Sequence, residues 1–313
     1  MSDILTIFTP TYNRAILLED LYKSLISQSC YDFEWLIIDD ESTDCTETIV
    51  KQWKTEQKKF LIRYYKQIHG GKHRALNKAF DLAFGDFFFI VDSDDQLIPN
   101  AVELVSKWCN NIKDNKIMAG VAGLKISMDG KTWGGDLDYK YGEYIDANNL
   151  ERQKYNMLGD KAEVYRTELL KRYKFPEYAG EYFVTEAVCW DSIAAAGYKI
   201  RWYNTPIYMC EYLEDGLTCS GANEIKGHCC NYQGYCYYVK QCMKIKSEID
   251  WMPEFIIFNK TGNYLGKSYK NKARDLNISI VKYGYYLTIK YVVIYFIRGI
   301  NKLIRVLGLR RKI

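Results

Sequence analysis

In the first part of the chain, segments with the pattern of buried strands alternate with segments whose apolar residues have helical spacing. Strands are predicted at residues 4–8, 33–38, 61–67 and 87–91, and the last of these begins with an unbroken apolar run. Between them, apolar residues recur every three or four positions over residues 15–27, 43–57 and 73–84, which predicts helices, the second capped by Ser42. This alternation is typical of an α/β fold with a parallel sheet.

The pattern changes in the second half. A helix is predicted from Pro99, a strand at 118–126, a loop with exposed aromatics at 133–151, and a strand at 201–209. Residues 224–272 are amphipathic and helical in pattern. We therefore expect two domains, a catalytic α/β domain at residues 1–223 and a mainly helical extension at 224–313.

Acidic residues follow the predicted strands. Asp39 and Asp40 end one strand, and Asp92, Asp94 and Asp95 end another. In open α/β sheets, ligands bind where strands end and helices begin, so these ends predict one crevice. Three carboxylates this close repel one another unless a hard cation offsets the repulsion. The alternative is an Asp-rich turn that caps the next helix.

The motifs at these strand ends resemble a known family. Thr-Pro-Thr-Tyr-Asn-Arg at 9–14, Ile-Ile-Asp-Asp-Glu-Ser-Thr-Asp at 37–44 and Val-Asp-Ser-Asp-Asp at 91–95 stand in the order and spacing of the family 2 glycosyltransferases. The resemblance implies a GT-A fold, which is a Rossmann-like nucleotide-binding domain. It also implies inverting transfer of a hexose-type sugar from a nucleotide-sugar donor to a glycan or lipid-linked acceptor in cell-surface polysaccharide synthesis.

The resemblance assigns the donor side of the site. Pro10 and Tyr12 would pack against the base, and Asp40 would accept a hydrogen bond from a uracil N–H group, which favours UDP. Gly-Gly-Lys-His at 70–73 precedes a helix, and a cation at a helix N-terminus suits a diphosphate. Lys72 is the first candidate and His73 the second. The alternative is a glycine turn with a solvated lysine.

The resemblance also assigns the metal. Asp92, Asp94 and Asp95 would hold Mn²⁺ or Mg²⁺ against the donor diphosphate, with Asp92 nearer the ribose or sugar. The cation would neutralise the charge that grows on the departing diphosphate.

An inverting displacement needs a base for the proton of the acceptor hydroxyl. A helix is predicted to begin after Thr185, which would be its cap. This places Glu186 in the first turn, where the family has an acidic base. Asp191 is the second choice and Glu181 the third. The alternative is that Glu186 only complements the helix dipole.

Charge is distributed unevenly along the chain. Residues 281–313 carry eight of the basic residues and no acid, so the remainder has a net charge of −4 although the whole chain has +4. Lys290 and Arg298 interrupt the apolar run from Tyr283 to Leu309, which favours an interfacial helix on a membrane over a spanning one. The alternative is a helix pair that packs on the domain or on a homodimer partner.

Other function classes fit less well. The first strand is not followed by Gly-x-Gly-x-x-Gly, which argues against a nicotinamide dehydrogenase, and residues 9–14 lack the glycines of a sugar-phosphate nucleotidyltransferase. A non-catalytic nucleotide-sugar or membrane-binding protein would not need the carboxylates and the base. No nucleic acid partner is expected. The chain starts without a signal peptide and its ten cysteines lack a disulfide framework, so we expect a cytoplasmic protein, peripheral on the inner face of the plasma membrane.

Overall fold

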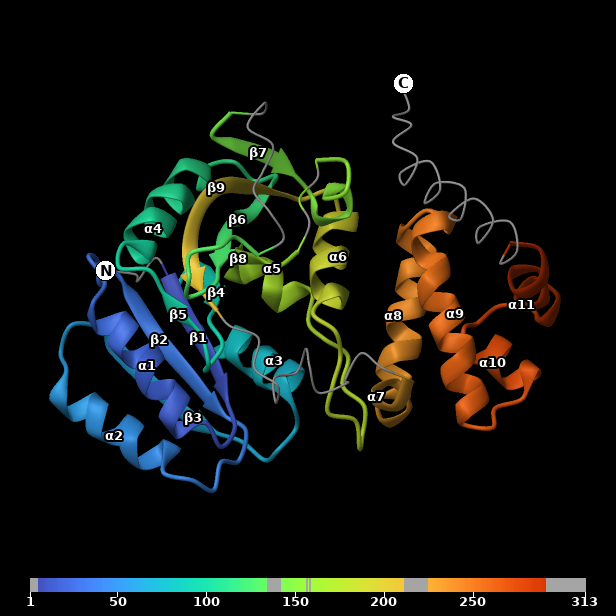
Figure 1. The fold of residues 1–313 in the computed structure, drawn as a ribbon, viewed down its shortest axis with the longest axis horizontal. Helices are drawn as coiled ribbons and strands as arrows, with labels where there is room; N and C mark the ends of the chain where they lie inside the picture. Colours follow the sequence, from blue (N-terminus) through green and yellow to red (C-terminus); the bar gives the residue numbers. More distant parts are fainter. Residues whose placement is uncertain (1–4, 134–141, 156, 158, 211–224, 291–313) are drawn as a thin grey trace. The chain divides into compact units, whose positions relative to one another are not determined.

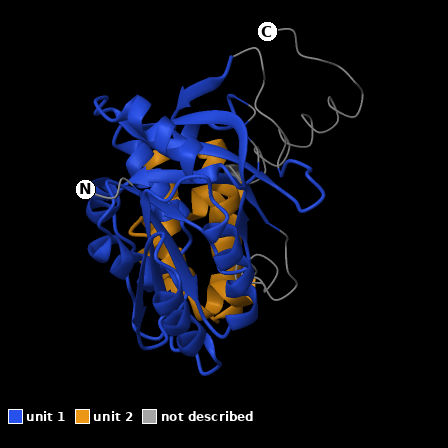
Figure 2. Ribbon diagram, turned by 90° about the vertical axis from the view of Figure 1, so that its left-hand side faces the viewer, with its two compact units in different colours: residues 1–219 blue, residues 220–313 orange. Residues whose placement is uncertain are grey.

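The computed structural model describes residues 5–133, 142–155, 157, 159–210 and 225–290. The chain divides into two compact units, Met1–Cys219 and Ser220–Ile313, which Figure 2 shows in separate colours. The domain boundary expected between residues 223 and 224 lies outside the described residues, so it remains a prediction.

The first unit is built on one mixed sheet (Figure 1). Its strands are β1 (Leu5–Thr11), β2 (Phe33–Asp39), β3 (Leu61–Lys66), β4 (Phe87–Ile90), β5 (Gln96–Leu97), β6 (Met118–Ile126), β7 (Tyr144–Ala147), β8 (Lys161–Arg166) and β9 (Lys199–Met209). The order is β3-β2-β1-β4-β8-β6-β9-β5, and β7 pairs with β9. The parallel pairing predicted for the first four strands is confirmed. The strand β8, which is antiparallel to both its neighbours, was not predicted from the sequence. The residues of β7 were predicted to be part of a loop.

Helices cover both faces of this sheet. They are α1 (Ala15–Ile26), α2 (Thr46–Glu56), α3 (Lys72–Leu82), α4 (Ala101–Ile112), α5 (Thr167–Arg172) and α6 (Ala187–Ala195), with a 3₁₀ turn at Asn149–Glu151. Leu21, Val50 and Val105 of α1, α2 and α4 share one apolar core with Ile7 and Phe89 of the sheet.

The other face of the sheet carries α3 and α6. Phe80 of α3 packs edge-on against Phe88, and Trp190 of α6 stacks on Tyr165. Phe88 and Tyr165 are direct partners across β4 and β8, so both point to this face. The helix that carries Lys72 and the helix that begins after Glu186 therefore lie on the same side of the sheet.

The polar loops after β1 and β2 lock together. Ser42 accepts a hydrogen bond from the Asn13 N–H group (2.8 Å), and Asn13 accepts one from the Thr43 N–H group (2.7 Å). Because Ser42 is used in this way, it does not cap α2, which begins three residues later than predicted. Asp44 accepts from the Thr46 N–H group instead (3.0 Å). The polar ends of β1 and β2 therefore lie side by side.

The second unit is helical. Its elements are α7 (Ile225–Cys230), α8 (Tyr232–Ile245), α9 (Glu248–Tyr264), α10 (Tyr269–Asp275), α11 (Ile280–Tyr285) and a π-helical turn at Tyr286–Lys290. Tyr283 and Tyr286 are buried in its core with Phe255 and Trp251. The start of the predicted membrane-binding tail therefore belongs to the core of this unit, because its tyrosines complete an apolar cluster. Residues 291–313 of the tail lie outside the described residues.

Within the ranges that the structure describes, none of the helices has the length and apolar character that crossing a membrane requires.

Candidate active site

Lys72 joins two carboxylates that lie far apart in the sequence. Its Nζ atom is 2.6 Å from Oδ1 of Asp92 and 2.9 Å from Oε1 of Glu186. Lys72 is the first residue of α3, Asp92 follows β4, and Glu186 is the N-cap residue of α6. The structure thus brings together one predicted donor-binding residue, one predicted metal ligand and the predicted base.

The charges in this group stabilise one another. Burial opposes the charged form of Lys72, but Asp92 and Glu186 outweigh it and raise the pKa of the ammonium group above its ordinary value. Burial likewise opposes the charged form of Asp92, and the neighbouring Lys72 and Lys125 hold its pKa below the ordinary value. An ammonium ion and a carboxylate are therefore both present at neutral pH.

The three aspartates after β4 point to three different partners. Asp92 pairs with Lys72, Asp94 pairs with Arg14 (2.6 Å), and Asp95 accepts a hydrogen bond from the Tyr208 hydroxyl (2.6 Å). In the described part of the chain, no three acidic, histidine or cysteine side chains converge to hold a metal by themselves. The three carboxylates therefore face different protein partners here, and the three-ligand metal set stays a prediction.

The donor chemistry still suits a hard cation shared with a ligand. Burial, and after it the charge of Asp92, raises the pKa of Asp95 to about 7, so a bound cation would stabilise its charged form. Mg²⁺ is commonly bound by one or two carboxylates together with substrate phosphates. Asp94 and Asp95 can supply such a partial set for Mg²⁺ or Mn²⁺.

The residues expected to contact the base lie at the edge of the site. Tyr12 is 46% exposed, and its ring lies 4.6 Å from that of His69, which in turn stacks on Tyr182 at 5.1 Å. Pro10 is half-buried within β1. These positions leave the Tyr12 ring available to a planar ligand.

Asp40 has a different set of partners from the one expected. Its carboxylate accepts hydrogen bonds from the backbone N–H groups of Gly70 (2.9 Å) and Gly71 (2.8 Å) and from the Gln67 amide (2.7 Å). Asp40 is buried and fastens the glycine loop before α3. A uracil N–H group would have to share oxygens that these donors already use, so the predicted base contact stays a prediction.

His73 does not fit its predicted role at the diphosphate. Successive helix residues point about 100° apart, so His73 turns into the interior while Lys72 faces the site. It is 2% exposed, and burial lowers its pKa to about 4, so the ring is neutral at pH 7. A buried neutral imidazole offers a diphosphate no charge.

Glu186 is the accessible member of the three candidate bases. Its side chain is 37% exposed, whereas Asp191 is 5% exposed and Glu181 is similarly buried. Thr185 is not the cap of α6 as predicted; Glu186 takes the N-cap position, but its side chain makes no capping hydrogen bond. Its carboxylate is directed to Lys72 instead, which favours the catalytic reading over the helix-dipole alternative.

Two charged residues near the site were missed by sequence reasoning. Lys125 of β6 is half-buried, with its Nζ atom 4.5 Å from the centre of the Tyr208 ring, and Asp92 and Asp95 raise its pKa against the effect of desolvation. Burial raises the pKa of Glu163 on β8 to about 7. A lysine near the end of an otherwise apolar predicted strand was the available signal for Lys125.

Residues 6–174 of this chain match the model of the family described as Glycosyl transferase family 2. Over 276 residues the chain is 25% identical to the GalNAc(5)-diNAcBac-PP-undecaprenol beta-1,3-glucosyltransferase of Campylobacter jejuni subsp. jejuni serotype O:2. That match covers 78% of this chain and 85% of the relative.

Two solved structures share the fold. S. aureus TarS 1–349 in complex with UDP-GlcNAc matches with a TM-score of 0.57 and 21% identity, over 86% of this chain and 74% of that one. The mannosyltransferase PcManGT from Pyrobaculum calidifontis, in complex with GDP-Man and Mn²⁺, matches with a TM-score of 0.52 and 17% identity, over 97% of this chain and 80% of that one. The α/β unit has the expected GT-A arrangement, and the C-terminal region is helical.

Proposed function

The chain belongs to glycosyl transferase family 2, and on this basis we propose that it transfers a sugar from a UDP-linked donor to a hydroxyl group of a glycan or lipid-linked acceptor, with inversion at the anomeric carbon. The observation that carries the proposal is the single ammonium group of Lys72 between Asp92 and Glu186. This arrangement supports the proposal because a diphosphate needs a cation, and the proton of an acceptor hydroxyl needs an accessible carboxylate.

The reaction divides between these residues. The oxygen of the acceptor hydroxyl bonds to the anomeric carbon while Glu186 accepts the proton of that hydroxyl, and the bond from the anomeric carbon to the diphosphate breaks. The departing UDP keeps the electron pair. Lys72 leaves Glu186 for the diphosphate as the donor binds, which frees the carboxylate to act as the base.

A divalent cation, held by Asp94 and Asp95 together with the diphosphate, would neutralise the charge of the leaving group. Its identity as Mn²⁺ or Mg²⁺ follows from the oxygen donors of the site. The protein's own part is to fix both carboxylates beside the positive charges of Arg14 and Lys125.

The acceptor class is proposed from the relative. The name of the C. jejuni protein specifies an undecaprenol-linked saccharide, which is a lipid-linked acceptor. Residues 291–313 of this chain add six basic and no acidic residues. A lipid-linked acceptor and a basic tail that attaches to the inner face of the plasma membrane are consistent with one another.

Incubation of the full chain with UDP-, GDP-, CDP- and dTDP-sugars tests the proposal. We expect nucleotide release from a UDP-sugar in the presence of Mn²⁺ or Mg²⁺, and its loss after chelation. Release from another nucleotide class alone would overturn the UDP assignment. Release that persists after chelation would overturn the metal assignment.

A further inference from the structure

The segment that leads to Glu186 has no regular secondary structure of its own. Between α5 and α6, residues 174–186 contain no helix or strand. Backbone carbonyl groups of such a segment need hydrogen-bond donors from elsewhere in the protein. Side chains of α3 supply several of them.

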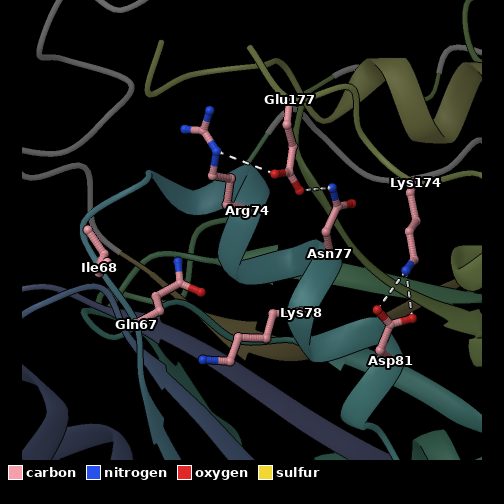
Figure 3. Close-up of a pocket in the computed structure, with 8 residues that line it drawn as sticks. All are labelled: Gln67, Ile68, Arg74, Asn77, Lys78, Asp81, Lys174 and Glu177. Carbon is pink, nitrogen blue, oxygen red and sulfur yellow. Dashed lines mark hydrogen bonds and ion pairs between the residues drawn. The ribbon is translucent and has the colours of Figure 1, made fainter. Parts of the chain in front are cut away.

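Arg74 supplies most of these donors. Its guanidinium group donates to the carbonyl oxygens of Gly70 (2.7 Å) and Glu181 (2.6 Å) and also to that of Tyr178. Its Nε atom lies 3.5 Å from Oε2 of Glu177, as Figure 3 shows. One rigid side chain therefore joins the loop before α3 to three residues of the segment.

Asn77, one turn further along α3, holds the start of the same segment. Its amide donates to the Phe175 carbonyl oxygen (2.9 Å) and accepts from the Phe175 N–H group (2.9 Å). The amide also donates to Glu177 (2.8 Å), and this contact is drawn in Figure 3. The segment is thus fixed at both its beginning and its middle.

Gly71 shows how closely the segment approaches α3. A Cβ atom at this position would lie 1.8 Å from the Tyr182 carbonyl oxygen, and the backbone has a φ of +86°. Only glycine fits both conditions. Asp40 in turn holds the N–H group of Gly71, so the connection runs from the end of β2 to within four residues of Glu186.

We propose that Arg74 is a positioning residue, which holds segment 174–186 so that Glu186 lies against Lys72 at the mouth of the site. This inference rests on the proposed function, because it assigns Arg74 a task in the transfer step. Arg74 does not contact Lys72, Asp92 or Glu186 itself. Its effect on the reaction runs through the backbone of the segment.

The test compares Arg74→Met with Lys78→Met. Arg74 and Lys78, one turn apart on α3, line one cavity of about 390 Å³ (Figure 3). Lys78 donates a hydrogen bond to the Lys66 carbonyl oxygen (3.1 Å) on β3 rather than to the segment. In Arg74→Met we expect kcat for sugar transfer to fall by about 10²-fold, since small misplacements of a catalytic group have effects of this size. The KM for the donor and the affinity for UDP should stay within about threefold. Lys78→Met should match the wild type.

Hydrogen exchange of residues 176–185 provides a readout that does not depend on activity. We expect faster exchange in Arg74→Met and unchanged exchange in Lys78→Met. Arg74→Lys, which retains one charged donor in place of the planar fork, should fall between the wild type and Arg74→Met in both measurements. It replaces Arg74→Met if the latter does not fold.

An unchanged kcat in Arg74→Met would overturn the positioning role. So would a loss of donor affinity as large as the loss in kcat. If the wild type transfers no sugar, the proposed function fails and hydrogen exchange alone decides. Faster exchange confined to the segment would then still support the structural role of Arg74, and unchanged exchange would overturn it.

Discussion

Two half-buried lysines flank the carboxylates after β4. Lys72 forms an ion pair with Asp92. Lys125 of β6 adds a second positive charge, over the Tyr208 ring. Together with Arg14 they offset the repulsion among Asp92, Asp94 and Asp95. At the scale of single residues, the site is an array of compensated charges, in which we propose that the diphosphate of the donor binds.

Lys125→Met should weaken UDP binding by about 10–100-fold, because a hydrogen bond to a charged group contributes about 1.5–3 kcal/mol. Lys131→Met, which removes an exposed lysine that pairs with Asp129 just beyond β6, is the control and should bind normally. Calorimetric titration with UDP measures both. Equal affinity in the two variants would show that Lys125 only compensates the aspartates.

Glu163 gives a prediction for pH dependence. Burial raises its pKa from 4.5 to about 7, so between these values the folded protein binds more protons than the unfolded chain. Its contribution to stability is therefore present below pH 4.5 and lost as the pH rises through 7. Glu163→Gln should raise the melting temperature at pH 8 by about 2 °C or more and leave it nearly unchanged at about pH 4, where Glu163 is protonated in both the folded and the unfolded state.

The control for Glu163 is Asp114→Asn, which neutralises an exposed acid in the turn after α4. Thermal unfolding at both pH values should show no such difference for it. A Glu163→Gln variant that melts lower at pH 8 would mean that its ion pair with Arg152, at 3.8 Å, outweighs the burial.

The candidate site residues that could be found from the sequence are those at the ends of helices and strands. Lys72, Asp92 and Glu186 each stand at a helix start or strand end, which local patterns reveal. Lys125 was missed because the aspartates that it faces are distant in sequence. His73 lies in the core because one step along a helix turns a side chain by about 100°, away from the side that Lys72 faces.

At the scale of elements, α3 has two separate tasks. Its first residue carries the positive charge of the site, while Arg74 and Asn77 hold the segment that leads to α6. The loop before α3 makes this possible by its close approach to Tyr182. A change in this loop should therefore affect both stability and the position of Glu186.

Gly71→Ala combines a backbone conformation that costs an L-residue about 1–3 kcal/mol with a steric clash against backbone. Gly180→Ala is a matched control, since its φ of +76° imposes strain but an added Cβ would meet nothing within 4 Å. We expect Gly71→Ala to lower the free energy of unfolding in urea by at least about 1 kcal/mol more than Gly180→Ala does. Equal losses would mean that the segment moves aside at little cost.

Local pattern was sufficient for β1 to β4 and for the helices between them, because each shows a clear apolar period or an unbroken apolar run. It failed for β7 and β8. These segments lack such a pattern and are strands because β9, β4 and β6 offer them hydrogen-bond partners. Pairing of this kind depends on the tertiary structure and leaves little trace in a single sequence.

At the scale of the whole molecule, the helical unit has an apolar core of its own, to which Tyr283 and Tyr286 belong. A chain that ends before them loses part of that core. The proposed attachment to membranes must therefore be tested on a chain that keeps residues up to Lys290. That truncation removes six of the eight basic residues of the tail.

A chain ending at Lys290 should fold and should bind anionic vesicles much more weakly than the full chain, since each basic residue near the surface contributes about 1 kcal/mol. A chain ending at Ser279 should lose the helical unit, which circular dichroism would detect. Sedimentation with anionic and neutral vesicles measures binding. Equal binding by the full chain and the chain ending at Lys290 would exclude the tail as the attachment site.

The proposed transfer from a UDP-sugar depends most on Glu186 as its base. The direct test is the transfer rate of Glu186→Gln at saturating donor, with UDP affinity measured on the same protein and Glu168→Gln, an exposed acid of α5, as the control. We predict a fall of about 10²–10⁴-fold in rate, with UDP affinity within a few-fold of the wild type. A Glu186→Gln variant that transfers sugar at a rate close to that of the wild type would contradict the role of Glu186 as the base.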